Sequence, residues 1–329
     1  MNIIVYTPDQ SASWERCARP WHLLRKRLPS DTQITFVNSN SPVRFQATWD
    51  HAGFFDLAFF HRPFHPDVAQ GIKAFKRLGV KIWVDYDDLL TAVPETNPAY
   101  SLYMNEHTQN AISSMLEDAD ILTASTQTLL ENLDSPAPVK AVVPNGHDFS
   151  VFNTPRAFDP NGPKIVMWRG SESHRRDVME FREPIEKAIK DNPDWKFYFV
   201  GMQPSMLKPM PNMRWVKPIE RTVFEDGMAL LKPRVMIVPL QDNLFNRCKS
   251  NIAAIHAVYA GAVPVVPDMD GWHCPGSSYY LDSVGFGMAL NEAMGRDTYK
   301  SQERFDWLQS MSLEKMNEIR YKIVMEAIG

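Results

Sequence analysis

The sequence predicts an α/β protein of two Rossmann-like domains that face each other across a cleft. Short apolar runs alternate with helical patterns along the chain, as they do in successive βαβ units of a parallel sheet. The alternation is interrupted at residues 144–163, a stretch rich in proline and glycine, and then starts again. The 329 residues also exceed what one hydrophobic core usually covers. We therefore expect two domains joined by this segment.

The first domain is expected at residues 1–150. Its strands are short apolar runs, and its helices carry apolar residues at intervals of three and four. In the first helix, for example, Trp14, Cys17, Trp21 and Leu24 follow that spacing. The expected strands are 3–6, 33–37, 56–60, 81–85, 120–123 and 140–143, and the expected helices are 14–28, 66–78 and 100–117.

The second domain is expected at residues 151–310, where the same alternation returns. Strands are expected at 164–168, 195–200, 213–216, 234–238 and 263–266, with helices at 175–190, at 222–231 and before the turn at Gly261. The tail carries apolar residues at helical spacing. It predicts a C-terminal helix at 311–329, which can cross back to the first domain.

Composition excludes several classes of protein. The chain has 44% apolar and 22% charged residues and a net charge of −4, and residues 1–150 hold 12 Lys and Arg against 17 Asp and Glu. This balance argues against a general polyanion-binding surface. Three cysteines give no disulfide framework and suit a reducing compartment. Because no signal peptide or bilayer-spanning apolar run is visible, we expect a cytoplasmic protein without stable membrane insertion.

A polar loop between the strand at 234–238 and the next helix predicts an anion site. It contains two cations, Arg247 and Lys249, beside Asn246, Ser250 and Asn251. Ligands of doubly wound sheets bind at the carboxyl ends of the strands, and a helix N-terminus there presents free N–H groups to an anion. A phosphate-bearing ligand is the main interpretation, and a solvated helix start is the alternative.

Three carboxylates, Asp85, Asp87 and Asp88, stand where the strand at 81–85 ends. Such a group can bind Mg²⁺ or Mn²⁺ through its oxygens, or it can hydrogen-bond an acceptor hydroxyl and take its proton. We favour the second role, with Asp87 or Asp88 as the base. Three further side chains are expected to point toward the same cleft: Arg16, His61 and Arg62.

Seven segments in order along the chain resemble the motifs of one enzyme family. They are WERCARPWHLL, FFHRPF, KIWVDYDDLL, DADILTAST, VVPNGHDFSVF, IVMWRGSESHRRDV and FNRCKSNIAAIHAVYAGAVPVV. Together they cover most of the chain, and they are similar to those of retaining, family 4-like glycosyltransferases with the GT-B fold, in the compact form common in bacterial and phage genomes. The resemblance implies a cytoplasmic enzyme, in the host cytoplasm if a phage encodes it.

The resemblance implies a nucleotide-diphosphate sugar as donor, with no further cofactor and no bound metal. The second domain is then the donor domain and the first the acceptor domain. The implied phosphate-binding residues are Arg169, Gly170, Ser171, Arg247, Lys249 and Ser250. The residues implied for the donor sugar or ribose are His174, Asn246 and His256.

On the acceptor side the resemblance combines with the cleft residues. Asp87, Asp88 and His61 are the expected catalytic residues, and Arg16, Arg62 and Asp85 are expected to bind the acceptor. Two acceptors remain open, a saccharide and a hydroxymethylated DNA base. The oligomeric state stays open as well.

The chain departs from the family at a Glu-x7-Glu motif. Cys248 and His256 stand at the two positions, so both acids are missing. The departure motivates a second hypothesis, a non-catalytic protein that binds nucleotide sugars or nucleic acid on a decayed GT-B scaffold. A dinucleotide oxidoreductase is a poor third, because no G-x-G-x-x-G follows the first strand of either domain.

Overall fold

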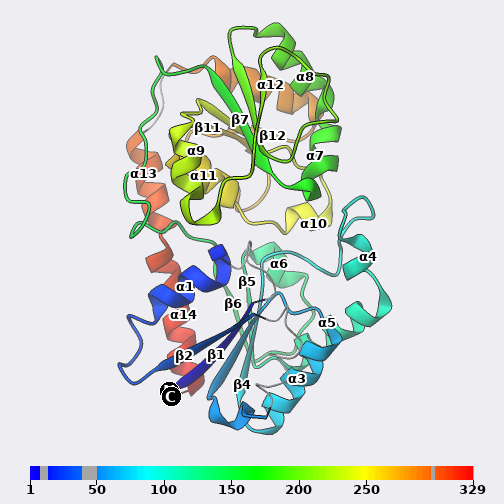
Figure 1. Cartoon of the computed structure of the whole chain (residues 1–329), viewed down its shortest axis with the longest axis vertical. Helices are drawn as coiled ribbons and strands as arrows, with labels where there is room; N and C mark the ends of the chain where they lie inside the picture. The colour runs from blue at the N-terminus through cyan, green and yellow to red at the C-terminus, as the bar shows by residue number, and fades with distance from the viewer. Residues whose placement is uncertain (8–13, 39–49, 298–300, 329) are drawn as a thin grey trace.

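The computed structural model describes residues 1–7, 14–38, 50–297 and 301–328. Two six-stranded parallel sheets, each with helices on both faces, form two domains that lie one above the other in Figure 1. The predicted α/β class and the two facing domains are confirmed.

The first sheet has the strand order β2-β1-β3-β4-β5-β6, and all its pairs are parallel. Its strands are β1 (Asn2–Thr7), β2 (Gln33–Asn38), β3 (Leu57–His61), β4 (Lys81–Tyr86), β5 (Ile121–Ala124) and β6 (Val139–Val142). The helices between them are a π-helix (Trp14–Ala18), α1 (Arg19–Leu24), a 3-10 turn (Ala52–Phe54), α3 (Pro66–Arg77), α4 (Tyr100–Tyr103), α5 (Glu106–Asp118) and α6 (Gln127–Glu131). Most predicted strands lie within two residues of these bounds.

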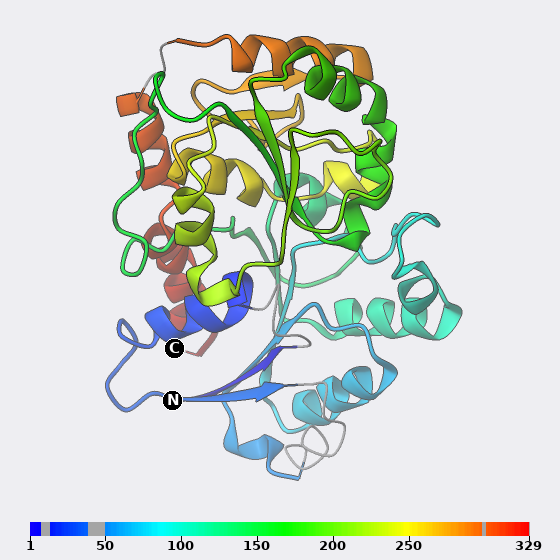
Figure 2. The same cartoon turned by 45° about the horizontal axis from the view of Figure 1, so that its top comes forward.

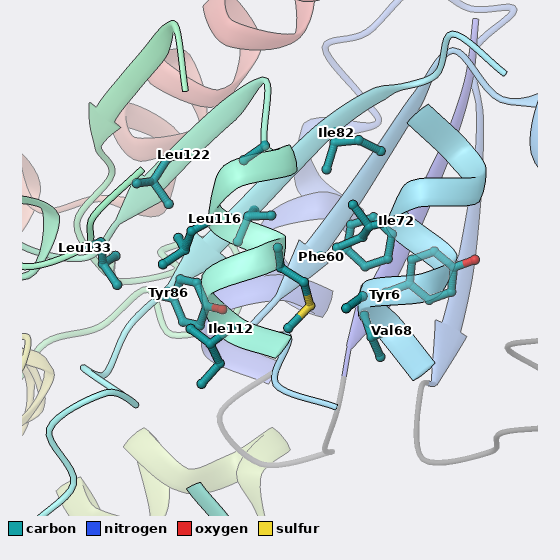
Figure 3. Close-up of a cluster of buried hydrophobic side chains, with 14 of the residues drawn as sticks. Tyr6, Phe60, Val68, Ile72, Ile82, Tyr86, Ile112, Leu116, Leu122 and Leu133 are labelled. Atoms are coloured by element: carbon teal, nitrogen blue, oxygen red, sulfur yellow. The ribbon is translucent and has the colours of Figure 1, made fainter. Parts of the chain in front are cut away.

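The central strands β1, β3, β4 and β5 are largely apolar and buried, and helices cover both faces of the sheet, as is usual for parallel sheets. One face packs under α3 and α5, and Figure 3 shows Ile72 of α3 and Ile112 of α5 close to Phe60 and Tyr86 of the strands. The other face packs against α1 and the last helix, α14 (Leu313–Ile328). The chain thus ends on the first domain, as Figure 2 also shows.

The second sheet has the order β12-β11-β10-β7-β8-β9 and is also parallel. Its strands are β7 (Ile165–Gly170), β8 (Lys196–Gly201), β9 (Met213–Val216), β10 (Val235–Ile237), β11 (Val263–Pro267) and β12 (Ser278–Tyr280). One face packs against α8 (Arg182–Asp191) and α12 (Ser283–Met294), and the other against α9 (Phe224–Leu230), α11 (Ile252–Tyr259) and α13 (Ser301–Ser310).

Several expected helices are interrupted, and two interruptions lie at the cleft. The helix expected at 175–190 is divided at Phe181 into α7 (Arg175–Glu180) and α8, after a 3-10 turn (Glu172–His174). The helix before Gly261 is preceded by a separate short helix, α10 (Leu244–Arg247). Lys249 and Ser250 therefore lie in the loop that leads into α11. A further 3-10 turn (Arg221–Val223) precedes α9.

Two segments connect the domains, the stretch between β6 and β7 and the junction of α13 and α14. The stretch after β6 runs beside the junction of α13 and α14, where the His147 amide donates to the Met311 carbonyl at 2.8 Å and the Leu313 amide donates to His147 at 2.7 Å. Gly146 is needed there, because a Cβ on it would lie 2.7 Å from the Leu313 Cα. Among the described residues, no helix is both long and apolar enough to cross a bilayer.

Candidate active site

A cavity of about 790 Å³ lies between the domains and is lined by both of them. The residues that line it follow the carboxyl ends of strands in each sheet, where a doubly wound fold binds its ligands. Asp87 and Asp88 follow β4, and Ser171 follows β7. The carboxyl ends of the two sheets thus share one cavity.

The first-domain wall carries charged groups that neutralise one another. Arg62 pairs with Asp87, Nε to Oδ1 at 2.8 Å, and also with Asp88. Lys249 of the second domain reaches Asp88, Nζ to Oδ1 at 3.2 Å. Burial raises the pKa of Asp88, but Lys249 and Arg62 outweigh it and hold that pKa below its usual range. Asp88 is therefore ionised at neutral pH.

Arg62 has a left-handed backbone, with φ of 48°. Its amide donates to the Asp85 carbonyl at 2.8 Å, which fixes the turn after β3 against the end of β4. A non-glycine residue in this region costs about 1–3 kcal/mol, and such residues gather at functional sites. The conformation places the guanidinium beside the two carboxylates.

The second-domain wall holds His174 through a buried carboxylate. Asp177 accepts from His174 Nδ1 at 2.9 Å, from the Gln241 amide at 3.0 Å and from Asn246 Nδ2 at 2.9 Å. Burial lowers the pKa of His174, so the ring is neutral at pH 7. Since the Nδ1–H of the neutral ring donates to Asp177, Nε2 carries no proton and is left as an acceptor. Asp177 is not among the residues that the sequence predicted for the site, so this contact was missed.

The predicted phosphate residues divide between two places. Arg169, Gly170, Ser171, Lys249 and Ser250 line the cavity. The Ser250 hydroxyl also accepts from Asn145 Nδ2 of the interdomain segment at 2.7 Å. Arg247 does not reach the cavity, because its 57% exposed side chain pairs with Asp242, Nη2 to Oδ2 at 2.7 Å, on the outer surface.

Among the residues predicted for the donor sugar or ribose, His174 and His256 line the cavity and Asn246 does not. The amide of Asn246 is buried and bonded to Asp177 and to the Gln241 carbonyl, so it holds the loop. Cys248 is fully buried and packs with Phe245 into the core of the first domain. The first position of the Glu-x7-Glu motif therefore contributes no carboxylate to the cavity.

Three predicted cleft residues, Arg16, His61 and Asp85, form a network beneath the cavity. Asp85 accepts from Arg16, Nη2 to Oδ1 at 2.6 Å, and lies 3.1 Å from His61 Nδ1. Thr123 donates to the same carboxylate at 2.6 Å. All are buried, and none of the three predicted residues lines the cavity. Arg16 holds the pKa of Asp85 well below its usual range, although burial alone would raise it.

Sequence reasoning missed a second polar group in the cavity. Glu15 of the first domain lies there with Arg169, Arg221 and His256. Glu15 and Arg221 are more than 200 positions apart in the sequence, so no local pattern could have connected them. Trp215 and Ile219 add an apolar wall at the same side of the second sheet.

No protein-family model matches the chain, and no curated protein matches it in sequence. Solved structures do match in fold. Anabaena Alr3699/HepE in complex with UDP-glucose has a TM-score of 0.66 at 12% identity, over 99% of this chain and 100% of that one. An alpha-glucosyltransferase in complex with UDP and a 13-mer DNA containing an HMU base has a TM-score of 0.57 at 12% identity, over 100% and 99%. UDP-GlcNAc 2-epimerase from Neisseria meningitidis, bound to UDP-GlcNAc, has a TM-score of 0.56 at 11% identity, over 99% and 100%.

At these identities the likeness concerns the fold. The neighbours span this chain and are spanned by it almost completely, so both domains and their arrangement are shared. The chain has the GT-B fold, with two parallel α/β domains facing each other across the cavity.

Proposed function

We propose that this protein is a glycosyltransferase of the family 4-like, retaining kind, which moves a sugar from a nucleotide-diphosphate sugar to an acceptor hydroxyl. The observation that carries the proposal is the distribution of charge in the cavity. Arg169, Lys249 and the start of α11 stand on the donor-domain wall, and Asp87 and Asp88 stand on the other. The similarity of the fold to structures in complex with UDP-sugars supports it.

The donor's diphosphate lies against Arg169, Gly170, Ser171, Lys249 and Ser250. When the bond from the anomeric carbon to the phosphate oxygen breaks, negative charge develops on the leaving diphosphate. Preorganised cations and backbone amides stabilise that charge most in the transition state. Gly170 leaves room for the approach, because even a Cβ there would lie 2.5 Å from the Trp168 ring.

His174 contacts the donor sugar. Asp177 fixes the orientation of the ring, and the free Nε2 accepts a hydrogen bond from a sugar hydroxyl. A neutral ring suits this position, because a second full positive charge would oppose the oxocarbenium-like charge on the sugar.

The acceptor hydroxyl lies beside Asp87, Asp88 and Arg62. In a retaining transfer the acceptor hydroxyl attacks the anomeric carbon from the face that the diphosphate leaves. The leaving phosphate oxygen therefore takes the proton of the acceptor hydroxyl, and Asp88 orients that hydroxyl. The arginine and lysine side chains neutralise the diphosphate, and the proposal needs no metal ion.

The acceptor we propose is a saccharide. A hydroxymethylated DNA base is the second candidate, favoured by the similarity to the alpha-glucosyltransferase with its HMU-containing DNA. The excess of acidic over basic residues in the first 150 positions weighs against DNA.

The missing carboxylates at Cys248 and His256 keep a second function open, a protein that binds nucleotide sugars or nucleic acid without catalysis. An assay with a panel of nucleotide sugars, with and without EDTA, separates the two. It records release of the nucleoside diphosphate and the thermal shift together. The transferase proposal expects one donor to raise the melting temperature and to turn over equally in EDTA.

The matched variants for this assay are Lys249→Ala and Lys187→Ala. Lys187 lies on α8 and pairs with Asp191 at the surface, so its loss should leave turnover unchanged. A donor that binds without turning over, with every acceptor tried, would support the non-catalytic function. Absence of any thermal shift would contradict both.

A further inference from the structure

Two buried glutamates from different domains meet near the segment that connects the domains. Glu15 lies in the π-helix before α1 of the first domain, and Glu225 lies in α9 of the second. One carboxylate oxygen of each side chain lies within 4.8 Å of one oxygen of the other. Glu15 is 9% exposed and Glu225 only 2%. We call these two residues the carboxyl pair. Figure 2 shows the yellow-green segment that leads into α9 beside the blue N-terminal helix.

Arg19 of α1 joins the carboxyl pair. Its Nη1 donates to Glu225 Oε1 at 3.0 Å and to Glu15 Oε2 at 3.3 Å. Its Nε lies 3.8 Å from a carboxylate oxygen of Asp148, in the segment between the domains. Arg19 is 4% exposed, and its guanidinium lies over the Phe152 ring at 5.0 Å from the centre. One cation therefore serves two carboxyl groups where both domains and the connecting segment meet.

The second oxygen of each glutamate has no partner. Within the described part of the chain, Glu15 Oε1 and Glu225 Oε2 are buried and accept no hydrogen bond. Most buried polar atoms are paired, because an unpaired one loses its bonds to water without replacement. Two facing carboxyl groups meet this need when they hold one proton, since the protonated oxygen donates and the other accepts. A separation within 4.8 Å allows that bond after a side-chain rotation or through one water molecule.

The surrounding charges place this proton on Glu225. Burial raises the pKa of both acids, and the charge of Glu15 raises that of Glu225 further, to about 7 in spite of Arg19. For Glu15, three guanidiniums oppose the effect of burial on the pKa, those of Arg19, Arg221 and Arg169. Asp148 acts on the pKa of Glu15 in the other direction. Like charges this close do not both ionise readily, so one proton stays on the pair up to about neutral pH.

The histidines near the pair keep their charge across neutral pH. A ring nitrogen of His256 lies within 4.8 Å of both carboxylates, and burial, with Arg169 and Arg221, holds the pKa of His256 well below its usual range. Burial also lowers the pKa of His147, which acts on His256, to about 4. Both rings are therefore neutral. A metal ion in place of the proton would add two charges to a buried site where three guanidiniums already act.

We propose that the carboxyl pair is a pH-sensitive clamp between the domains, closed while Glu225 holds a proton and released when it gives that proton to water. The proton leaves through the cavity, which Glu15 lines. Two buried anions then share one guanidinium, and their repulsion moves α9 away from the π-helix and α1. Because the pair lies near the connecting segment, this movement changes the width of the cavity, whatever ligand the cavity binds.

The direction of the pH dependence follows from the folded-state pKa of Glu225. That pKa is raised to about 7, above the value of about 4.3 for an unfolded chain. A group raised in this way stabilises the closed arrangement fully below about pH 4, and the stabilisation is lost as the pH rises through about 7. We therefore expect the clamp to hold in mild acid and to release in mild base.

The test measures the distance between nitroxide labels on His22→Cys of α1 and Leu230→Cys of α9 by double electron–electron resonance. Both positions are exposed, and the native cysteines are buried. In wild type the distance should be constant below about pH 6 and lengthen above it, with half of the change at about pH 7. In Glu225→Gln, whose amide donates to Glu15 as the protonated acid does, the short distance should persist to about pH 8. Glu183→Gln, an exposed change on α8, should follow wild type.

Circular dichroism shows whether each labelled variant is folded. If Glu225→Gln fails to fold, Glu15→Gln decides, because it supplies the same neutral donor from the other domain and should also keep the short distance. A wild-type distance that is the same at about pH 6 and about pH 8 would overturn the clamp. So would a transition that survives in the glutamine variants. A melting temperature that rises with ZnCl₂ in wild type, but not in Glu225→Gln, would replace the proton with a metal ion.

Discussion

Lys249 and Asp88 form an ion pair between the two domains, with Nζ 3.2 Å from Oδ1. Lys249 lies in the loop before α11, and Asp88 follows β4 of the opposite sheet. Asp88 also accepts from Arg62. In the free protein, a carboxylate of the acceptor domain thus holds the cation that we assign to the diphosphate. If the proposed function holds, a bound donor would compete with Asp88 for Lys249.

This competition predicts that Asp88→Asn tightens nucleotide binding while it slows transfer. The pair is partly exposed, so removing it should free Lys249 at a gain of about two- to fivefold in affinity. Transfer should fall because the acceptor loses the group that orients it. Calorimetry with UDP and a turnover assay measure the two effects separately. Asp67→Asn, an exposed change on α3, is the control, and weaker nucleotide binding in Asp88→Asn would contradict the idea.

Lys249 and Arg247 are two residues apart, but their replacement by alanine is expected to affect turnover differently. Lys249→Ala should slow turnover by about tenfold to a few hundredfold, since one charge-assisted bond contributes about 1.5–3 kcal/mol. Arg247→Ala should stay within about twofold of wild type, because its pair with Asp242 is exposed. Release of nucleoside diphosphate under saturating donor measures both. Similar losses in the two variants would argue against the assignment of Lys249.

The fold was predictable because the central strands are largely apolar, buried runs, and such runs can be located within one or two residues. The short strand β12 and the helix α6 were not expected. The interruptions of the helices were harder to predict. The break after α10, for example, depends on Phe245 and Cys248, which pack into the first domain. That contact joins positions far apart in the sequence.

The site was predictable where a residue directly follows a strand, as Asp87, Asp88 and Ser171 do. It was not predictable where it depends on the direction in which a side chain points. Asp85 lies within β4 and points to Arg16, whereas the aspartates after the strand reach the cavity. Glu15 and Glu225 look like ordinary helix acids until the fold brings them together.

Asp177→Asn should lower turnover by about tenfold or more, because it removes the charged acceptor that fixes His174. The bond from Asp177 raises the pKa of His174 against the lowering effect of burial. The variant should therefore lower that pKa further, which an NMR titration of the ring follows. Asp191→Asn, at an exposed position on α8, should change neither quantity. An unchanged pKa would show that Asp177 does not control the ring.

Asp85→Asn should lower the free energy of unfolding by about 3–5 kcal/mol at pH 7, because it leaves Arg16 buried without its partner. The folded-state pKa of Asp85 is depressed, so its stabilisation is complete above the unfolded pKa of about 4 and is lost as pH falls through the folded value. The difference between wild type and variant should thus be constant from about pH 5 to 8 and shrink below about pH 4. Urea unfolding across this range tests it, with the exposed Asp31→Asn as control. If the difference in free energy of unfolding between wild type and variant grew as the pH falls, the folded-state pKa of Asp85 could not be depressed.

Gly201→Ala should damage both stability and donor binding, because Gly201 ends β8 beside the proposed phosphate turn. Its φ is 99°, and a Cβ there would lie 2.3 Å from the Gly170 carbonyl oxygen. That oxygen also accepts from the Met202 amide at 2.9 Å, so the strand ends would have to separate. Gly79→Ala isolates the backbone strain, since Gly79 has φ of 81° and open space around it, and should cost only about 1–2 kcal/mol. Gly201→Ala should melt at a lower temperature than Gly79→Ala. It should also bind UDP at least about tenfold more weakly than wild type does, because a loss of about 1.4 kcal/mol of binding free energy lowers the affinity tenfold. Equal melting temperatures with unchanged UDP affinity would show that the ends of β7 and β8 do not form the donor site.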